Sequence, residues 1–578
     1  MQSFLPTSRA EMDARGWDTC DVVIATPDAY VDHPSFAMAI LSRFLEAHGY
    51  RVGILSQPRW KEPSAFTALG IPRIAFVVSG GNMDSMVLNY TPAKKPRRED
   101  LYCEGGVPYF SRPGEGRRYR IRPERVVTVY SSQIRAAAPR TPVIIGGIEA
   151  SMRRIAHYDW WSDSVRRSVL ADAKAHLLIY GMGEYPLLDA VRALEGGSAP
   201  DDLEIPGTAV LRHDPGEVPG VVQLPSFEEV GLDREAFAEA FCAFERNRDR
   251  HVLFQKQDGR FLVQYPRRDL SPEELDACYD LPFCRAPHPR FRKIPAFEMI
   301  RDSITAHRGC YGDCAFCALP AHQGRTIVSR SPASVEAEAR AIARSPGFSG
   351  TISDVGGPSA NMYGSSCAIG GCADRDCAKC GEGCPHLLPG TGDYLALLAG
   401  VSRVEGVKQV RVSSGLRVDP VICDGEFLDA FFPYIPGQLK IGLESGSDHV
   451  LRIMHKPPTR YFTQFLSKFS EIARRRGMKR YPNPYLIVGH PGEGEGELGQ
   501  TIRYLEEQGL SGHQFQIFTP TPLTRATAIY YLGYDPCTGD AIEVERDLRV
   551  LEERKARLIT RDRGRRRDRR SSQWYDRA

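Results

Sequence analysis

Residues 308–317 read RGCYGDCAFC, with Cys310, Cys314 and Cys317 in a C-x3-C-x2-C pattern on one short loop. Three thiolates with this spacing can each bind one iron of a cubane [4Fe–4S] cluster, and the fourth iron then stays open to a substrate or cofactor. A zinc site completed by His307 or His322 is the alternative that the spacing leaves open. The loop therefore predicts a metal centre, which we interpret as an iron–sulfur site with one open iron.

Strands and helices alternate along the chain beyond this loop. Five strand-like runs follow it, at residues 349–355, 409–414, 439–446, 485–492 and 515–520. Together with a first unit that begins near Lys293, before the cysteine loop, these runs amount to six strand–helix units. Ligand-binding loops are expected at the carboxyl ends of the strands. Gly356 and Gly357 follow the first of these runs, and without side chains their backbone carbonyls can approach an ammonium group closely.

The N-terminal part of the chain shows the same alternation. Its strand-like runs lie at residues 21–25, 51–55, 74–78, 143–145 and 177–180. Three of the runs end in glycine and are followed by helical stretches, which predicts a doubly wound parallel sheet. His33, Glu149, His157 and Asp159 either line a polar cleft in this region or are buried structural residues, and the sequence leaves both interpretations open.

The cysteine loop resembles that of the radical S-adenosylmethionine (SAM) superfamily, with an aromatic residue, Phe316, just before the last cysteine. Longer stretches are similar to the YgiQ-type radical SAM family, over roughly residues 20 to 560. These stretches are GGIEAS (146–151), HYDWWSD (157–163) and GGPSANMY (356–363). The resemblance implies an N-terminal doubly wound, Rossmann-like domain of the cobalamin-binding type, followed by a partial (β/α)6 radical SAM barrel.

The resemblance also implies the chemistry. SAM chelates the fourth iron, and one electron from the reduced cluster cleaves a C–S bond to give a 5′-deoxyadenosyl radical that acts on an unidentified substrate. A reductant such as flavodoxin or ferredoxin is the expected electron donor. Phe316 is expected to pack against the adenine. The other residues expected in the SAM pocket, by their positions in the motifs, are Gly356, Gly357, Arg411, Ser413, Glu444 and Gly489.

A second group of cysteines lies in an insertion at residues 361–390. Its members are Cys367, Cys372, Cys377, Cys380 and Cys384. The segment has few apolar side chains, so a bound metal is the expected source of its stability. A structural zinc site, with His386 as a further ligand candidate, and a second Fe–S cluster remain alternatives, as do redox-active or simply reduced thiols.

Cobalamin is not expected, because the chain has no Asp-x-His-x-x-Gly stretch to supply a lower axial imidazole. Residues 554–570 carry ten basic and two acidic side chains, which makes RNA binding through the tail a hypothesis. The rival function is therefore a non-enzymatic, zinc-stabilised protein that binds nucleic acid with this tail. A solvated tail without a partner is the third interpretation.

Composition sets the broader limits. The 578 residues are 42% hydrophobic and 25% charged, which excludes wholesale disorder, and the net charge of +3 gives no general attraction to nucleic acid or membranes. No leader or long apolar run is evident, so we expect a cytoplasmic protein without a membrane segment. The expected divisions are an N-terminal domain (1–202), a connector (203–292), the barrel (293–545) and a helical to disordered tail (546–578).

Overall fold

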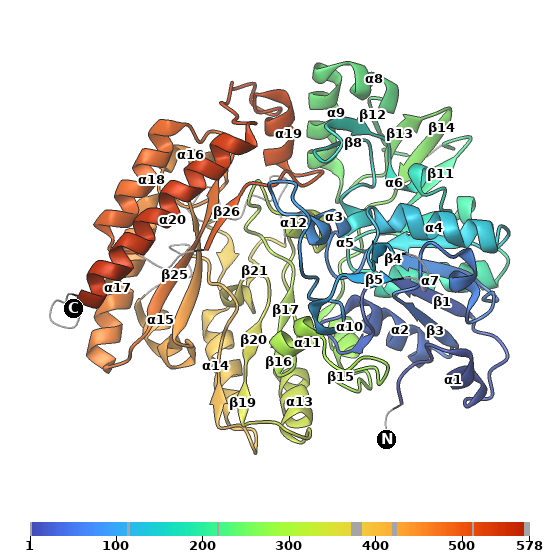
Figure 1. The fold of residues 1–578 in the computed structure, drawn as a ribbon, viewed down its shortest axis with the longest axis horizontal. Helices are drawn as coiled ribbons and strands as arrows, with labels where there is room; N and C mark the ends of the chain where they lie inside the picture. The colour runs from blue at the N-terminus through green and yellow to red at the C-terminus, as the bar shows by residue number, and fades with distance from the viewer. Residues whose placement is uncertain are drawn as a thin grey trace. The chain divides into compact units, whose positions relative to one another are not determined.

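A computed structural model describes residues 3–111, 116–216, 219–370, 384–418, 425–510 and 514–571 (Figure 1). The chain forms two compact units. The first comprises Met1–Leu270, Ala277–Arg301 and Thr521–Leu523, and the second comprises Ser271–Asp276, Asp302–Pro520 and Thr524–Ala578. The cysteine loop lies in the second unit.

The first unit is built on a nine-stranded sheet in the order β12-β13-β14-β11-β10-β7-β4-β1-β3. Its parallel half consists of β1 (Val22–Thr26), β3 (Val52–Ser56), β4 (Ala75–Ser79), β7 (Val143–Gly146) and β10 (Leu177–Ile179). β1 lies between β3 and β4, so the strand order reverses there, and the crevice between β1 and β4 is the topological switch point. The predicted doubly wound sheet is confirmed.

The other half of this sheet comes from the segment 203–292, which we expected to be a connector. It supplies β11 (Thr208–Arg212), β12 (Val222–Leu224), β13 (Leu253–Gln257) and β14 (Arg260–Gln264). β11 runs antiparallel to β10, and β14 and β13 continue the sheet beyond it. The segment therefore differs from our expectation, because its strands bury apolar side chains such as Val210 and Val263. Its proline-rich pieces had hidden this pattern.

Helices follow the parallel strands of the first unit. They include α2 (Ala37–Ala47), α4 (Val126–Ala137), α5 (Gly147–Ser151) and α7 (Glu184–Glu195). In α2, Ile40 lies four and five residues before Phe44 and Leu45, which places the three buried side chains on one face of the helix. The helix begins at Ala37, several residues after Asp32, whose carboxylate is bound by Arg43.

In the described part of the second unit, six barrel strands follow one another along the chain, with β19 and β20 counted as two parts of one strand. They are β16 (Ser303–Thr305), β19 with β20 (Thr351–Ile352 and Asp354–Gly356), β23 (Gln409–Val410), β24 (Gln438–Glu444), β25 (Tyr481–Val488) and β26 (Gln514–Ile517). Each pairs in parallel with the next, and a parallel bridge between Leu416 and Ile441 joins the β23 segment to β24. This arrangement confirms the predicted partial (β/α)6 barrel, or partial TIM barrel.

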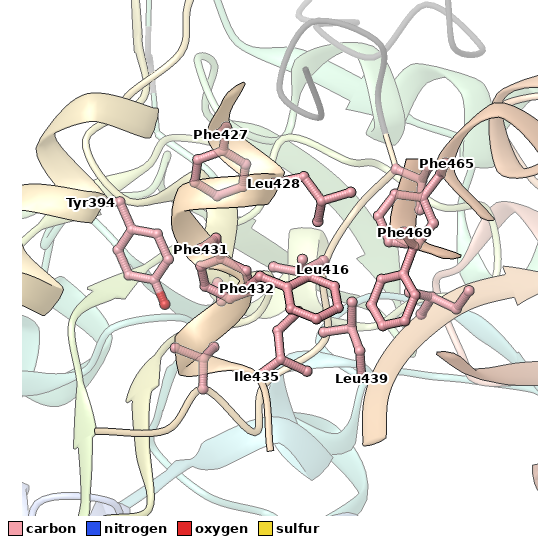
Figure 2. Close-up of a cluster of buried hydrophobic side chains, with 14 of the residues drawn as sticks. Tyr394, Leu416, Phe427, Leu428, Phe431, Phe432, Ile435, Leu439, Phe465 and Phe469 are labelled. Carbon is pink, nitrogen blue, oxygen red and sulfur yellow. The ribbon is translucent and has the colours of Figure 1, made fainter. Parts of the chain in front are cut away.

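An aromatic core holds the barrel strands in place (Figure 2). Phe427 and Phe431 of α15 (Gly425–Phe431) stack with ring centroids 5.4 Å apart. Phe465 and Phe469 of α17 (Thr459–Arg476) enter the same core, and Phe469 contacts Phe432 at 5.0 Å. Such close packing fixes the strands, and therefore the loops at their carboxyl ends.

The C-terminal segment forms α20 (Leu548–Ser571), which packs on β26 and β25 (Figure 1). The expected helical start of the tail is thus present, while residues 572–578 lie outside the described part of the chain. Among the described residues, no helix combines the length and the apolar character that crossing a membrane requires.

Candidate active site

The cysteine loop lies between β17 (His307–Arg308) and α12 (Leu319–His322), just after the first barrel strand. Backbone hydrogen bonds fix the loop: Ala315 N–H donates to Met454 O at 3.0 Å, and Ala526 N–H donates to Ala315 O at 2.8 Å. The three predicted metal ligands are thus carried by a loop whose centre, at Ala315, is hydrogen-bonded to two other segments of the chain.

The thiols of the loop influence one another. Burial, and then the neighbouring Cys314, raise the pKa of Cys310 to about 11. The pKa of Cys317 is raised for the same reasons, by burial first and then by Cys314 and Cys310. Buried thiols become thiolates when a strongly positive centre binds them, so the donor set of this loop fits an iron–sulfur cluster.

The alternative of a single zinc ion requires at least three ligands that converge on one point. Within the described ranges, no three His, Cys, Asp or Glu side chains are grouped in this way. The thiolates of a cubane cluster need no such convergence, because each binds a different iron.

Two of the thiols are hydrogen-bond acceptors. Leu319 N–H donates to Cys317 Sγ at 3.4 Å, and Arg417 Nη1 lies 3.5 Å from Cys314 Sγ. Arg417 belongs to no motif that the sequence analysis identified, because its contact depends on the tertiary fold. The predicted pocket residue Arg411, by contrast, is exposed and donates to Gln409 Oε1 at 2.8 Å.

Phe316 forms part of an aromatic wall. Its ring meets that of His490 edge to face at 5.9 Å, and His490 in turn contacts Phe518 at 5.1 Å. His490 Nδ1 is 2.9 Å from Pro491 O, which assigns its proton to Nδ1 and leaves Nε2 as a buried acceptor with no partner among the described residues. Burial lowers the pKa of His490 to about 4, so the ring is neutral at neutral pH.

Glu444 ends β24 in a strained conformation. Its φ of 68° lies in the left-handed region, where the register of β24 against β25 also shifts. Its carboxylate is 3.9 Å from Lys456 Nζ, and burial raises its pKa while Lys456 opposes the shift. Burial is the main cause of the raised pKa of Cys317, and Glu444 adds a smaller contribution in the same direction.

The glycine pair has a packing role. A Cβ on Gly356 would lie 2.5 Å from Ser414 Oγ, and one on Gly357 would lie 2.5 Å from His307 Cε1. Neighbouring side chains therefore leave room only for glycine at these two positions. This packing requirement is separate from the predicted contact between the glycine backbone and a ligand. Ser413 donates its Oγ proton to Ser353 O at 2.7 Å.

Gly489 begins a loop that α20 holds in place. Its N–H donates to Glu493 Oε1 at 2.7 Å, and a Cβ on it would lie 2.2 Å from Leu551 Cδ2. Arg554 Nη1 donates to Glu493 O at 2.9 Å. Burial raises the pKa of Glu493 to about 7, although the Gly489 N–H and Arg554 oppose the shift.

The second cysteine group is described only at its ends. β21 (Ser366–Cys367) pairs with β22 (Leu387–Leu388), and Leu387 N–H donates to Cys384 O at 3.1 Å. Cys367 and Cys384 thus belong to the base of the insertion. Cys372, Cys377 and Cys380 lie outside the described residues.

The switch point of the first unit is occupied by charged side chains. Asp28, after β1, accepts from Arg122 Nη2 at 2.7 Å, and Arg122 Nε donates to Asp100 at 2.8 Å. All three side chains are less than 5% exposed. A Cβ on Gly81, after β4, would lie 2.6 Å from Asp28 Oδ1, so the crevice is filled.

The other polar residues of this unit have different surroundings. Glu149 and His157 line a small cavity together with Arg125 and Arg153. Asp159 pairs with Arg125 at 2.7 Å, and His33 Nε2 lies 2.8 Å from Arg285 Nη2. All four residues are buried, so the choice between a polar cleft and a structural role stays a prediction.

Comparison with known families agrees with this architecture. Residues 4–303 match the model for the radical SAM N-terminal family, and residues 304–505 match that for the radical SAM superfamily. The chain belongs to the radical SAM superfamily. As a radical SAM enzyme, it uses a [4Fe–4S] cluster and SAM, and its specific reaction is not identified.

Relatives that are similar over nearly the whole chain are named UPF0313 proteins. A UPF0313 protein of Methanocella arvoryzae is 43% identical over 552 residues, which cover 94% of this chain and 90% of the relative. One of Thermotoga neapolitana is 42% identical over 583 residues, covering 97% and 99%. This radical SAM chain is therefore a member of the UPF0313 family, the YgiQ-like group that the motifs had indicated.

A solved structure supports the fold. The radical SAM methyltransferase TsrM of Kitasatospora setae, with a SAM analogue and tryptophan bound, has a TM-score of 0.52 and 16% identity. The match covers 88% of this chain and 75% of TsrM. TsrM has also been solved with cobalamin and a [4Fe–4S] cluster. At this identity the similarity concerns the fold alone.

Proposed function

We propose that Cys310, Cys314 and Cys317 bind three irons of the [4Fe–4S] cluster and that SAM binds the fourth through its amino and carboxylate groups. The observation that supports this most strongly is the hydrogen-bonded loop that carries Cys310, Cys314 and Cys317 directly after the first barrel strand. When bound and reduced, the cluster would supply one electron for cleavage of a C–S bond of SAM, and the radical chemistry that follows would act on an unidentified substrate.

The chain's own residues bind and orient SAM in this proposal. The adenine packs on Phe316, and its amino group donates to the unpartnered Nε2 of His490. The buried carboxylate of Glu444 accepts from the ribose hydroxyls, since it is next to the cysteine loop and beyond hydrogen-bonding distance of Lys456. Roles in the pocket for Gly356, Gly357, Arg411, Ser413 and Gly489 remain predictions.

The ligand assignment is tested with Cys314→Ala. After anaerobic reconstitution with iron, sulfide and a chemical reductant, the variant should lose the [4Fe–4S] EPR signal and form no 5′-deoxyadenosine from SAM. Cys20→Ala is the matched control, because Cys20 is buried beside Met12 in the first unit. Formation of 5′-deoxyadenosine by the Cys314→Ala variant would overturn the assignment.

We also propose that the first unit does not bind cobalamin. The support is the missing Asp-x-His-x-x-Gly stretch and the Asp28–Arg122–Asp100 network that fills the switch point. Titration of the protein with hydroxocobalamin, followed by gel filtration, should leave the protein fraction free of cobalt. Stoichiometric retention of cobalamin in the protein fraction would overturn this proposal.

The remaining parts of the proposal concern partners. The electron donor is a low-potential protein such as flavodoxin or ferredoxin, and the oxygen-sensitive cluster favours a reducing, cytoplasmic location. The second cysteine group holds either zinc or a further Fe–S cluster. Metal analysis of Cys367→Ser/Cys384→Ser against the native protein tests this: loss of zinc or of extra iron supports a site, and unchanged content excludes one that uses these two cysteines.

RNA binding through the arginine-rich tail is the second candidate function, and it rests only on the charge of residues 554–570. A salt titration of RNA binding compares the full chain with one that lacks residues 561–578. Weaker binding and a smaller salt dependence in the shortened chain would support the tail's role. Equal affinities would exclude it.

A further inference from the structure

A buried arginine reaches the sulfur of one cluster ligand. Arg417 is 4% exposed, and its Nη1 lies 3.5 Å from Cys314 Sγ and 2.9 Å from Gly312 O. Both acceptors belong to the cysteine loop. The guanidinium is therefore directed at the thiol of Cys314.

Neighbouring residues fix Arg417 in this position. Its N–H donates to Asn361 Oδ1 at 3.1 Å, and Asn361 Nδ2 donates to Arg417 O at 2.8 Å. A Cβ on Gly312 would lie 2.1 Å from Arg417 Nη1, so only glycine leaves room for the guanidinium. Asn361 and Gly312, from two other segments of the chain, thus hold the guanidinium of Arg417 beside Cys314.

We propose that Arg417 sets the reduction potential of the cluster by donating a charge-assisted hydrogen bond to Cys314 Sγ. This rests on the proposed function, in which Cys314 binds iron. Reduction adds one electron, taken from a one-electron reductant, and makes the cluster and its thiolates more negative by one unit. A fixed positive charge at the sulfur stabilises the reduced form more than the oxidised form, and so raises the potential.

The hydrogen bond to Cys314 differs from the one to Cys317 in the charge of its donor. Cys317 accepts from a neutral backbone N–H of Leu319, whereas Cys314 accepts from a guanidinium. Hydrogen bonds with a charged donor are roughly twice as strong as neutral ones. Arginine also keeps its proton at all accessible pH values, so no proton accompanies the electron at this residue. Arg417 is thus a positioning residue that raises the reduction potential of the cluster, so a weaker reductant can reduce it.

The test uses full-length protein, reconstituted anaerobically, and measures the midpoint potential by EPR-monitored redox titration. Arg417→Gln removes the charge and should shift the potential downward. Arg417→Lys keeps the charge without the planar fork and should give an intermediate value. Asn361→Ala keeps Arg417 but releases it, and should also shift the potential downward. Arg340→Gln, which removes an exposed arginine paired with Glu336 on α13 (Pro332–Ala343), should leave it unchanged.

The outcomes separate this assignment from the proposed function. Equal potentials for the native and Arg417→Gln clusters would overturn the role of Arg417 while leaving the ligand assignment intact. Where Arg417→Gln binds less iron, the potential of the loaded fraction still decides, together with that of Asn361→Ala. Failure of the native protein to form any [4Fe–4S] cluster would overturn both.

Discussion

The strand ends of the two units use buried charge in different ways. In the first unit, Arg122 donates to Asp28 and Asp100 at 2.7 and 2.8 Å, so each buried charge has a partner of opposite charge within the network. In the second, the buried His490 Nε2 has no partner in the described part of the chain, whereas Glu444 is 12% exposed and forms an ion pair with Lys456 at 3.9 Å. Buried polar groups that are left incompletely satisfied are costly, so they indicate where a ligand binds. A closed ion network indicates a site without one.

The strongest test of the closed network is Arg122→Met. Two buried carboxylates would lose their shared cation, and we expect the free energy of unfolding to fall by about 3–5 kcal/mol. Urea unfolding followed by circular dichroism measures the change. The triple variant Asp28→Asn/Arg122→Met/Asp100→Asn carries no net charge and should recover much of the loss. A fall below about 1 kcal/mol, as at a surface pair, would mean that the network is not closed.

The second unit should respond to pH through Glu493. Its pKa is raised to about 7 from 4.5, so the folded state holds a proton that the unfolded state releases between these values. Unfolding free energy should therefore decrease as pH rises through this window, by up to about 3 kcal/mol. Glu493→Gln should remove the slope, as unfolding curves at about pH 5 and about pH 8 would show. Parallel slopes in both proteins would assign the effect to another group.

Glu444→Gln tests the partly satisfied carboxylate. If Glu444 accepts from the ribose of SAM, loss of the charged acceptor should cost about 1.5–3 kcal/mol, or roughly tenfold or more in the Kd for SAM. Equilibrium dialysis of the reconstituted protein measures the affinity. Glu336→Gln on α13 is the control and should leave the Kd unchanged. An unchanged Kd in Glu444→Gln would instead make Glu444 a structural partner of Lys456.

The smallest expected effect concerns His490. His490→Phe removes the Nε2 acceptor but keeps an aromatic ring beside Phe316, so SAM should bind about 1 kcal/mol more weakly, or roughly fivefold. The inosine analogue of SAM lacks the adenine amino group and should bind both proteins equally. A similar loss for SAM and for the analogue would contradict a hydrogen bond to the amino group and would point to ring packing alone.

Local patterns in the sequence predicted the features that depend on local spacing. The three-cysteine loop, the parallel strands and Phe316 all follow from residues close together in the chain. Arg417 was missed because its contact with Cys314 spans 103 residues and has no local pattern. The strands of segment 203–292 were missed because proline-rich pieces interrupt the pattern and because their pairing, which joins β11 to β10 and β14 to β11, depends on the tertiary fold.

The contacts of α20 bear on the order in which the protein matures. Leu551 and Arg554 pack on Gly489 and Glu493, and they are translated long after the cysteine loop. The loop at Gly489 can therefore reach its final conformation only after α20 has been synthesised and has packed on it.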